Sequence, residues 1–269
     1  MPTIPVLMYH HISPLKGDTI TVTPEVFEAH MRLLKDQGFF TPSLHELMDF
    51  IEGKAGFKGK AAVITFDDGY LDNYIYGFPV LKSLGIKAVV FLVTGWADMA
   101  SLQGLDKFGL IDAYRAVPVP HNRTKELIER ADAAKVVMDW AMIEEMRASG
   151  FVEFGSHTMT HRECDKLKED ELDKELRGSK SAIEARLKTE CKYLSWPRGK
   201  YNAACLRAAK EAGYSAVFTT EPGVCKPGDD PFSIKRIVVK DDVDWFRKRL
   251  RIYTSTVLSS LYLKVKGRI

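Results

Sequence analysis

The sequence repeats one local pattern four times: an amphipathic segment, a glycine, and then a run of β-branched and aromatic residues. Glycine adopts the left-handed backbone conformation that ends many helices, and the residue types after it favour strands. The four glycines are Gly38, Gly85, Gly150 and Gly213. Helices and strands that alternate in this way build a parallel sheet, so the pattern predicts an α/β fold.

Seven apolar segments are expected to form the strands of that sheet. They cover 5–9, 61–66, 87–93, 152–155, 193–196, 216–219 and 234–239. With 269 residues and 45% apolar side chains, the chain is large enough for one barrel-sized domain, and no phosphate-binding glycine motif follows any of the strands. We therefore predict a single domain over 1–269, a distorted or incomplete (β/α) barrel of about seven parallel strands.

Two segments depart from the regular alternation. Prolines interrupt the stretch 97–135, where we expect an irregular insertion that lies over the site. The segment 245–269 holds seven Lys or Arg and no Asp or Glu. Such a segment could lie on an anionic membrane surface, or it could be the last barrel helix with a solvated basic face. Its apolar residues would share one helical face: Leu250, Tyr253, Val257 and Leu261.

Composition narrows the partners and the compartment. A net charge of +3 gives no general attraction to nucleic acid, so we expect no nucleic-acid partner. The N-terminal apolar run has no basic residue before it and ends at His10, which argues against a secretory signal. The four cysteines lack CxxC spacing and favour free thiols in a reducing compartment. We expect a cytoplasmic protein, peripheral to the inner face of the membrane if the basic segment binds it.

Acidic residues and histidines follow two of the expected strands, at the same end of the barrel. Asp67 and Asp68 follow one strand, and His157 and His161 follow another. Two histidines four residues apart can face one side if the backbone turns helically, and a carboxylate completes a metal site with open positions. The second aspartate could then accept a proton from an activated water. Either motif alone is unspecific, but together they indicate a catalytic metal site.

A further pair of histidines follows the first expected strand. His10 or His11 could act as a general acid toward a leaving amine, because an imidazole titrates near neutrality. At least one of the two is expected to be an ordinary core or exposed residue. His30 and His45 fall on predicted helices and are interpreted as structural or solvated, while His121 has no assigned role.

Taken together, the stretches TFDDGY, SHTMTH and SWPRGKYN resemble three motifs of the NodB-homology polysaccharide deacetylases, carbohydrate esterase family 4. The resemblance implies a distorted barrel that holds a divalent metal and removes the acetyl group from N-acetylated sugars, such as those of a cell-surface polysaccharide. If the basic C-terminal segment binds a membrane, a lipopolysaccharide-type precursor is a further expected substrate. It implies that Asp67 is the general base and that Asp68, His157 and His161 bind the metal, commonly zinc, with Ni²⁺ or Co²⁺ as alternatives.

The opening LMYHHIS resembles a circularly permuted subgroup that includes poly-N-acetylglucosamine deacetylases, in which a Tyr-His near the N-terminus supplies the acid. His10 is the matching residue. The family's third motif has an Arg that pairs with the catalytic Asp, but here Ser195 and its neighbour stand in that region. The missing cation could come from Arg236, which follows the pattern of the subgroup, or from Arg198.

Residues near these motifs are expected to contact the substrate. The backbone N–H of Arg198, after Pro197, could stabilise the oxyanion whatever the side chain. Trp96 and Trp196 would offer surfaces to the acetyl group or the sugar unless they pack within the rim, which is the preferred interpretation for Trp96, and Tyr70 is also expected to contact the substrate.

Two other functions remain compatible with the sequence. One is a metal hydrolase of a non-sugar amide, imide or ester, because the motifs specify a metal site and not a substrate. The other is a non-catalytic glycan-binding relative, which the altered third motif makes conceivable. The sequence does not indicate an oligomeric state.

Overall fold

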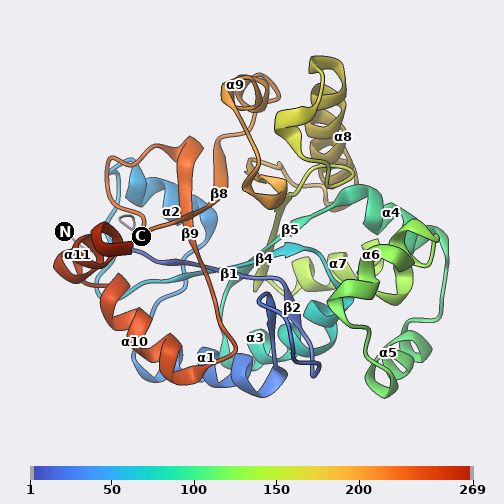
Figure 1. Ribbon diagram of the computed structural model, residues 1–269, viewed down its shortest axis with the longest axis horizontal. Coiled ribbons are helices and arrows are strands. Elements are labelled where there is room, and N and C mark those ends of the chain that lie inside the picture. The colour runs from blue at the N-terminus through green and yellow to red at the C-terminus, as the bar shows by residue number, and fades with distance from the viewer. Residues whose placement is uncertain (1–2, 267–269) are drawn as a thin grey trace.

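The computed structural model describes residues 3–266, and its centre is a closed barrel of seven parallel strands (Figure 1). The strands follow one another around the barrel in chain order, and the last returns to pair with the first. Their bounds are β1 Val6–Tyr9, β4 Val63–Asp68, β5 Ala88–Leu92, β6 Val152–Ser156, β7 Tyr193–Ser195, β8 Ala216–Pro222 and β9 Ile234–Val238. The predicted barrel is confirmed, and each of the seven expected strands is present.

Helices surround the barrel, and short elements lie at its ends (Figure 1). The helices are α1 Pro24–Asp36, α2 Leu44–Ile51, α3 Phe78–Leu84, α4 Thr94–Leu102, α5 Lys107–Ala116, α6 His121–Glu129, α7 Trp140–Ala148, α8 Glu169–Leu187, α9 Ala203–Glu211, α10 Val243–Tyr253 and α11 Thr256–Lys266. The short elements are the paired strands β2 His11–Ile12 and β3 Thr21–Val22, and the helical turns η1 Asn73–Gly77, η2 Ala133–Lys135, η3 Cys164–Lys166, η4 Pro197–Gly199 and η5 Pro231–Ser233.

The barrel is distorted on one side. Strands β6 and β7 share one residue pair, and the register between β8 and β9 shifts between Phe218 and Pro222. Gly155 in β6 allows the strands to close there, because a Cβ at this position would come within 2.7 Å of the Phe91 ring and 2.9 Å of the Tyr193 carbonyl. Close packing of side chains from neighbouring strands fills the interior.

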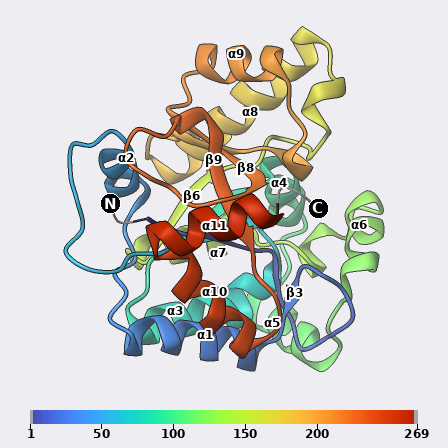
Figure 2. The same cartoon turned by 60° about the vertical axis from the view of Figure 1, so that its left-hand side comes forward.

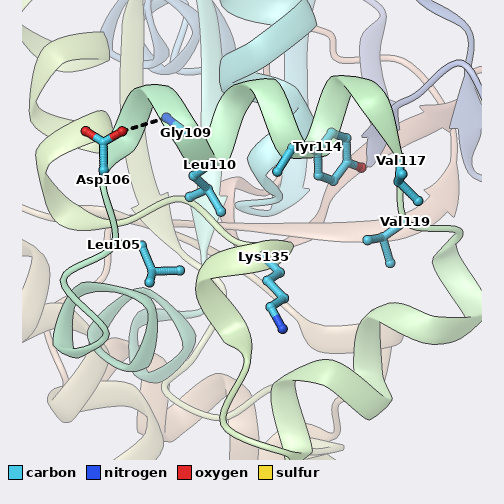
Figure 3. A pocket seen from close by; sticks show the side chains of 9 residues that line it. Leu105, Asp106, Gly109, Leu110, Tyr114, Val117, Val119 and Lys135 are labelled. Carbon is cyan, nitrogen blue, oxygen red and sulfur yellow. Dashed lines mark hydrogen bonds between the residues drawn. The ribbon is translucent and has the colours of Figure 1, made fainter.

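The stretch 97–135 is not the irregular insertion that we expected. It holds most of α4 together with α5 and α6, which lie on one side of the barrel (Figure 1). The prolines mark the entry to α6, where Pro120 is the N-cap residue in extended conformation. An apolar cavity of about 400 Å³ runs along α5, lined by Leu105, Leu110, Val117 and other side chains (Figure 3). Proline therefore marks a helix boundary here and not a long loop.

The basic C-terminal segment forms two helices, so its apolar residues do not share one continuous face. Leu250 and Tyr253 of α10 are buried, whereas Val257 and Leu261 of α11 are exposed. The Thr3 hydroxyl donates to the Tyr253 carbonyl, which places the end of α10 beside the start of β1 (Figure 2). Residues 267–269 of the segment lie outside the described residues. Within 3–266, the helices lack the combination of length and apolar character needed to cross a membrane.

His30 of α1 is a core residue, as one of the two interpretations of this histidine proposed. Its Nδ1 lies 3.2 Å from the Tyr9 hydroxyl, and its ring stacks on Phe246 with centroids 4.0 Å apart. Burial lowers the pKa of His30 to about 4. The folded protein therefore favours the neutral imidazole.

We predict that His30 makes the fold less stable in acid. Because its pKa is about 4 in the folded protein and near 6.5 in the unfolded chain, the unfolded chain binds the proton first as the pH falls. The free energy of unfolding should decrease from about pH 6.5 to about pH 4, by up to about 3 kcal/mol from this group. Urea denaturation of wild type and His30→Gln gives the free energy of unfolding of each. The difference between the two should narrow by up to about 3 kcal/mol as the pH falls from about 6.5 to about 4. His45→Gln, at an exposed site, should keep the wild-type dependence, and parallel curves for wild type and His30→Gln would contradict the prediction.

Candidate active site

The two adjacent aspartates, Asp67 and Asp68, are the last residues of β4, whereas the sequence predicted that they follow a strand ending at residue 66. Asp68 has a φ of 76°, a left-handed conformation that is rare for a residue with a side chain. The two carboxylates consequently have different partners. Asp67 contacts Arg236 of β9, and Asp68 lies near His157 and His161.

Asp68, His157 and His161 form a cluster that could hold a metal ion. The Asp68 Oδ1 atom lies 3.4 Å from Nε2 of His157 and 3.3 Å from Nε2 of His161. The three candidate ligand atoms lie within 4.8 Å of one another. Asp68 Oδ1 is buried and has no hydrogen-bond partner among the described residues. A buried, unpaired carboxylate oxygen that faces two imidazole nitrogens fits a divalent cation such as Zn²⁺.

The two histidines are held in the form that binds metals. The backbone carbonyl of Ser195 lies 2.8 Å from His157 Nδ1, which must donate to it, so the lone pair of Nε2 faces the cluster. Burial lowers the pKa of His161 to about 4, and the neighbouring His157 acts in the same direction. His157 can therefore direct Nε2 to the cluster, and the ring of His161 is neutral near pH 7.

The loop that carries these histidines is not helical, contrary to our expectation. Thr158 and His161 both have positive φ, 66° and 61°. Glu175 of α8 holds the loop in this conformation: its Oε2 accepts from the backbone N–H groups of Met159 and Thr160, each at 2.8 Å. The sequence reasoning missed Glu175. A signal was available, because this acidic residue falls on the face of α8 that packs against the barrel.

Asp67 forms a buried ion pair with Arg236. Nη1 and Nη2 of Arg236 lie 2.7 Å from Oδ1 and Oδ2 of Asp67, and both side chains are at most 3% exposed. Burial would raise the pKa of Asp67, but the Arg236 guanidinium outweighs it and holds that pKa well below its usual range. Arg198 instead lies near Glu163, at 3.4 Å on the surface. Of the two arginines that the sequence left open, Arg236 is the one that contacts Asp67.

Ser195 occupies the region where the resemblance led us to expect an arginine. Its hydroxyl accepts a hydrogen bond from Arg236 Nη2 at 2.8 Å and lies 3.4 Å from Asp67 Oδ2. Its small side chain leaves room for the guanidinium that arrives from β9. The cation is therefore present but comes from another strand.

His10 faces the aspartates, and His11 does not. His10 Nε2 lies 4.0 Å from Asp67 Oδ2, and its side chain is 17% exposed. Burial lowers the pKa of His10, although Asp67 and Asp68 oppose the shift. His11 is buried and contacts Asp72 instead. His10 is thus the histidine of the pair that could reach a substrate.

A cleft of about 690 Å³ opens beside the cluster. His161, Tyr70, Trp96 and the exposed Arg198 line it, together with residues of α6. The Trp96 ring lies 5.3 Å from His161 and 6.5 Å from Tyr70, centroid to centroid. Aromatic faces of this kind suit the apolar face of a sugar ring.

Trp196 does not line the cleft, which corrects our expectation that it contacts the substrate. Its side chain is fully buried, and its ring stacks on Tyr201. Pro197 is also buried, in the turn η4, where Arg198 has a φ of 55°. This turn can offer its backbone to a ligand, whereas the tryptophan belongs to the core.

We predict that Glu175 supports metal binding without touching the ion. Glu175→Ala would leave the N–H groups of Met159 and Thr160 without their acceptor, so the loop should lose its fixed shape. Zn²⁺ affinity, measured by competition with a chromogenic chelator, should fall by about 10- to 100-fold. Glu169→Ala, an exposed change on the same helix, should bind as wild type. Equal affinity for a folded Glu175→Ala protein would refute this role.

Comparisons with known proteins agree with this geometry. Residues 54–217 match the family model of the polysaccharide deacetylases. YxkH of Bacillus subtilis is 30% identical over 236 residues, which is 88% of this chain and 71% of that protein. A poly-beta-1,6-N-acetyl-D-glucosamine N-deacetylase of Staphylococcus aureus is 25% identical over 245 residues, 87% of this chain and 73% of the relative.

Solved structures share the fold. The Streptococcus pyogenes deacetylase PplD, in complex with acetate, aligns with a TM-score of 0.74 at 21% identity over 95% of this chain and 100% of that one. IcaB from Ammonifex degensii aligns with a TM-score of 0.72 at 22% identity, over 95% of this chain and 98% of that one. The family match covers most of the chain, includes Asp67, Asp68 and both cluster histidines, and confirms the resemblance. The chain belongs to the polysaccharide deacetylase family of hydrolases.

Proposed function

We propose that this protein removes acetyl groups from an N-acetylglucosamine-containing glycan, with a divalent metal at Asp68, His157 and His161. The observation that carries the proposal is the convergence of these three side chains beside an Asp67 that Arg236 keeps ionised. The name of the Staphylococcus aureus relative supports the choice of glycan. Zinc is our choice of metal, because two imidazoles and one carboxylate suit it, with Ni²⁺ and Co²⁺ as alternatives.

A metal bound there would supply a Lewis acid that polarises the acetyl carbonyl and makes water more acidic. Side-chain and backbone groups of the chain would carry out the proton transfers and stabilise the oxyanion. Asp67 accepts the proton of the attacking water, since its carboxylate is ionised at neutral pH and lies next to the cluster. The backbone N–H of Arg198 donates to the developing oxyanion.

His10 is the proposed acid. It stands 4.0 Å from Asp67, so it can reach the same reacting centre. The nitrogen of the sugar needs a proton as its bond to the acetyl carbon breaks, and an imidazole can give one near neutral pH. Arg236 positions Asp67 and takes no direct part in the proton transfers.

The partners and the compartment are further parts of the proposal. Four buried cysteines, none in a disulfide, support a cytoplasmic location and thus a glycan precursor that is made inside the cell. The exposed apolar side chains of α11 beside the basic α10 support peripheral contact with an anionic membrane. The end of α10 lies beside the start of β1, whereas His10 follows the end of that strand, so contact through the end of α10 and through α11 would leave the cleft free.

We predict that metal-loaded protein releases acetate from β-1,6-linked N-acetylglucosamine oligomers. Asp67→Asn and His10→Ala should each lower kcat at least about 100-fold, because each removes a proton-transfer group. Both variants should still bind Zn²⁺, since the three ligands are unchanged, and His45→Ala should keep wild-type activity. Acetate release can be followed with a coupled enzyme assay.

Two results would redirect the proposal. Turnover of simple aryl esters or imides without turnover of any glycan would point to another acyl substrate. Tight metal and glycan binding without any product would indicate a binding protein of the same family.

A further inference from the structure

Next to the cleft, three side chains form a hydrogen-bonded chain that the proposed reaction does not use. Asp72 lies in the turn between β4 and η1, His11 in β2, and His121 at the start of α6. Asp72 Oδ2 lies 2.7 Å from His11 Nδ1, and His11 Nε2 lies 3.1 Å from His121 Nδ1. Asp72 and His11 are almost fully buried, whereas His121 is half-buried and lines the cleft. The chain therefore leads from a buried carboxylate to the ligand surface.

The neighbours of Asp72 determine which nitrogen of His11 carries the hydrogen. Asp72 accepts hydrogen bonds from the Ile12 N–H, the Asn73 side-chain amide and the Tyr114 hydroxyl, at 3.3, 2.9 and 3.2 Å. Each of these groups has a hydrogen to give, so the carboxylate acts as the acceptor in every contact. His11 Nδ1 must then donate as well. In the neutral form of His11, which the proposal below requires, the other nitrogen, Nε2, then accepts.

This arrangement fixes the form of His121. Because His11 Nε2 accepts, His121 Nδ1 donates to it, and His121 Nε2 keeps its lone pair. Burial lowers the pKa of His121, and the neighbouring His11 adds to the shift, so the neutral ring is favoured. The ring of His11 is itself held by stacking on Tyr70, with centroids 3.7 Å apart. His121 is thus prepared as a hydrogen-bond acceptor at the wall of the cleft.

The surroundings of His121 indicate the kind of group that it accepts from. The half-buried Trp96 and the buried Tyr70, which stacks on His11, both line the same cleft, and Asn122 and Lys125 add polar groups next to His121. An apolar face beside hydrogen-bonding groups is the surface that a sugar ring requires, and a sugar presents many hydroxyl donors. A lone pair on a fixed imidazole nitrogen suits such a hydroxyl.

We propose that His121 is a substrate-positioning residue, whose Nε2 accepts a hydrogen bond from a sugar hydroxyl while Asp72 and His11 hold its ring and tautomer. The inference rests on the proposed function, because it takes the ligand of the cleft to be a glycan. The same network reaches the candidate acid: the Asn73 amide also donates to the His10 carbonyl at 2.7 Å. The network that positions His121 therefore also positions His10, through Asn73.

Two substitutions of His121 separate its two nitrogens. The amide of Asn reaches about as far as Nδ1, so His121→Asn should keep the contact with His11 but lose the group that faces the sugar. The longer His121→Gln should restore a polar atom near the position of Nε2. For N-acetylglucosamine oligomers we expect His121→Asn to raise KM by about 3- to 10-fold, as for one lost hydrogen bond, with a smaller effect on kcat. His121→Gln should recover most of the loss.

His45→Asn is the matched control, because His45 is 81% exposed and its helix α2 lies across the molecule from α6 (Figures 1 and 2). It should keep the wild-type KM. An unchanged KM in His121→Asn, or an equal loss in the Asn and Gln variants, would overturn the assignment. If wild type itself releases no acetate from glycans, the proposed function fails, and this outcome is distinct from a failure of His121.

The tautomer can be measured without any turnover. Long-range ¹H–¹⁵N spectra of the histidine rings at neutral pH should show the hydrogen of His121 on Nδ1, although free imidazole side chains favour Nε2. His11→Asn keeps a donor for Asp72 and removes the acceptor for His121, so the hydrogen should move to Nε2 in this variant. A wild-type His121 that carries its hydrogen on Nε2, or a charged ring, would refute the proposal.

Discussion

The ion pair between Asp67 and Arg236 is the interaction on which the site depends. A guanidinium with less than 2% exposure would be very costly to bury alone, and its two 2.7 Å contacts with the carboxylate offset that cost. The pair also joins β4 to β9, two strands that are not neighbours in the barrel but flank β1. Closure of the barrel therefore brings the Arg236 guanidinium next to Asp67. The position of the Asp67 carboxylate depends on β9, the last strand of the chain.

The metal cluster depends on backbone that is strained locally. Asp68, Thr158 and His161 all have positive φ, and such conformations cost about 1 to 3 kcal/mol each in residues with side chains. The Glu175 carboxylate holds the histidine loop in this shape by accepting hydrogen bonds from its backbone, and Asp68 is fixed as the last residue of β4. The shape of the cluster is thus imposed by the barrel and α8.

Much of this arrangement could be predicted from the sequence, because local patterns encode it. Apolar runs located the strands, and the positions of Asp67, Asp68, His157 and His161 at strand ends brought them to one rim. Features that depend on contacts between residues far apart in the sequence could not be predicted from local patterns. The choice of Arg236 over Arg198 follows from barrel closure, and the burial of Trp196 follows from its packing on Tyr201. The prolines before α6 resemble those of a loop, although they precede a helix. No local signal in the sequence shows that the C-terminal segment divides into two helices, α10 and α11.

Two hydrogen-bonded networks lie near the metal cluster: Arg236 with Asp67, and Asp72 with His11 and His121. On one side, Arg236 supplies a positive charge that keeps Asp67 ionised and fixed, which concerns the reacting centre. On the other, Asp72 contacts His11 Nδ1 and His11 Nε2 contacts His121 Nδ1, and in our proposal these contacts leave His121 Nε2 as an acceptor toward the cleft. Tyr70 lies between them, stacked on His11 and lining the cleft. Asp67 is thus held by Arg236, whereas Asp72 supports His121 and, through Asn73, also the backbone of His10. Substitutions in the second network can change the choice of glycan while the carboxylate at the reacting centre keeps its partner.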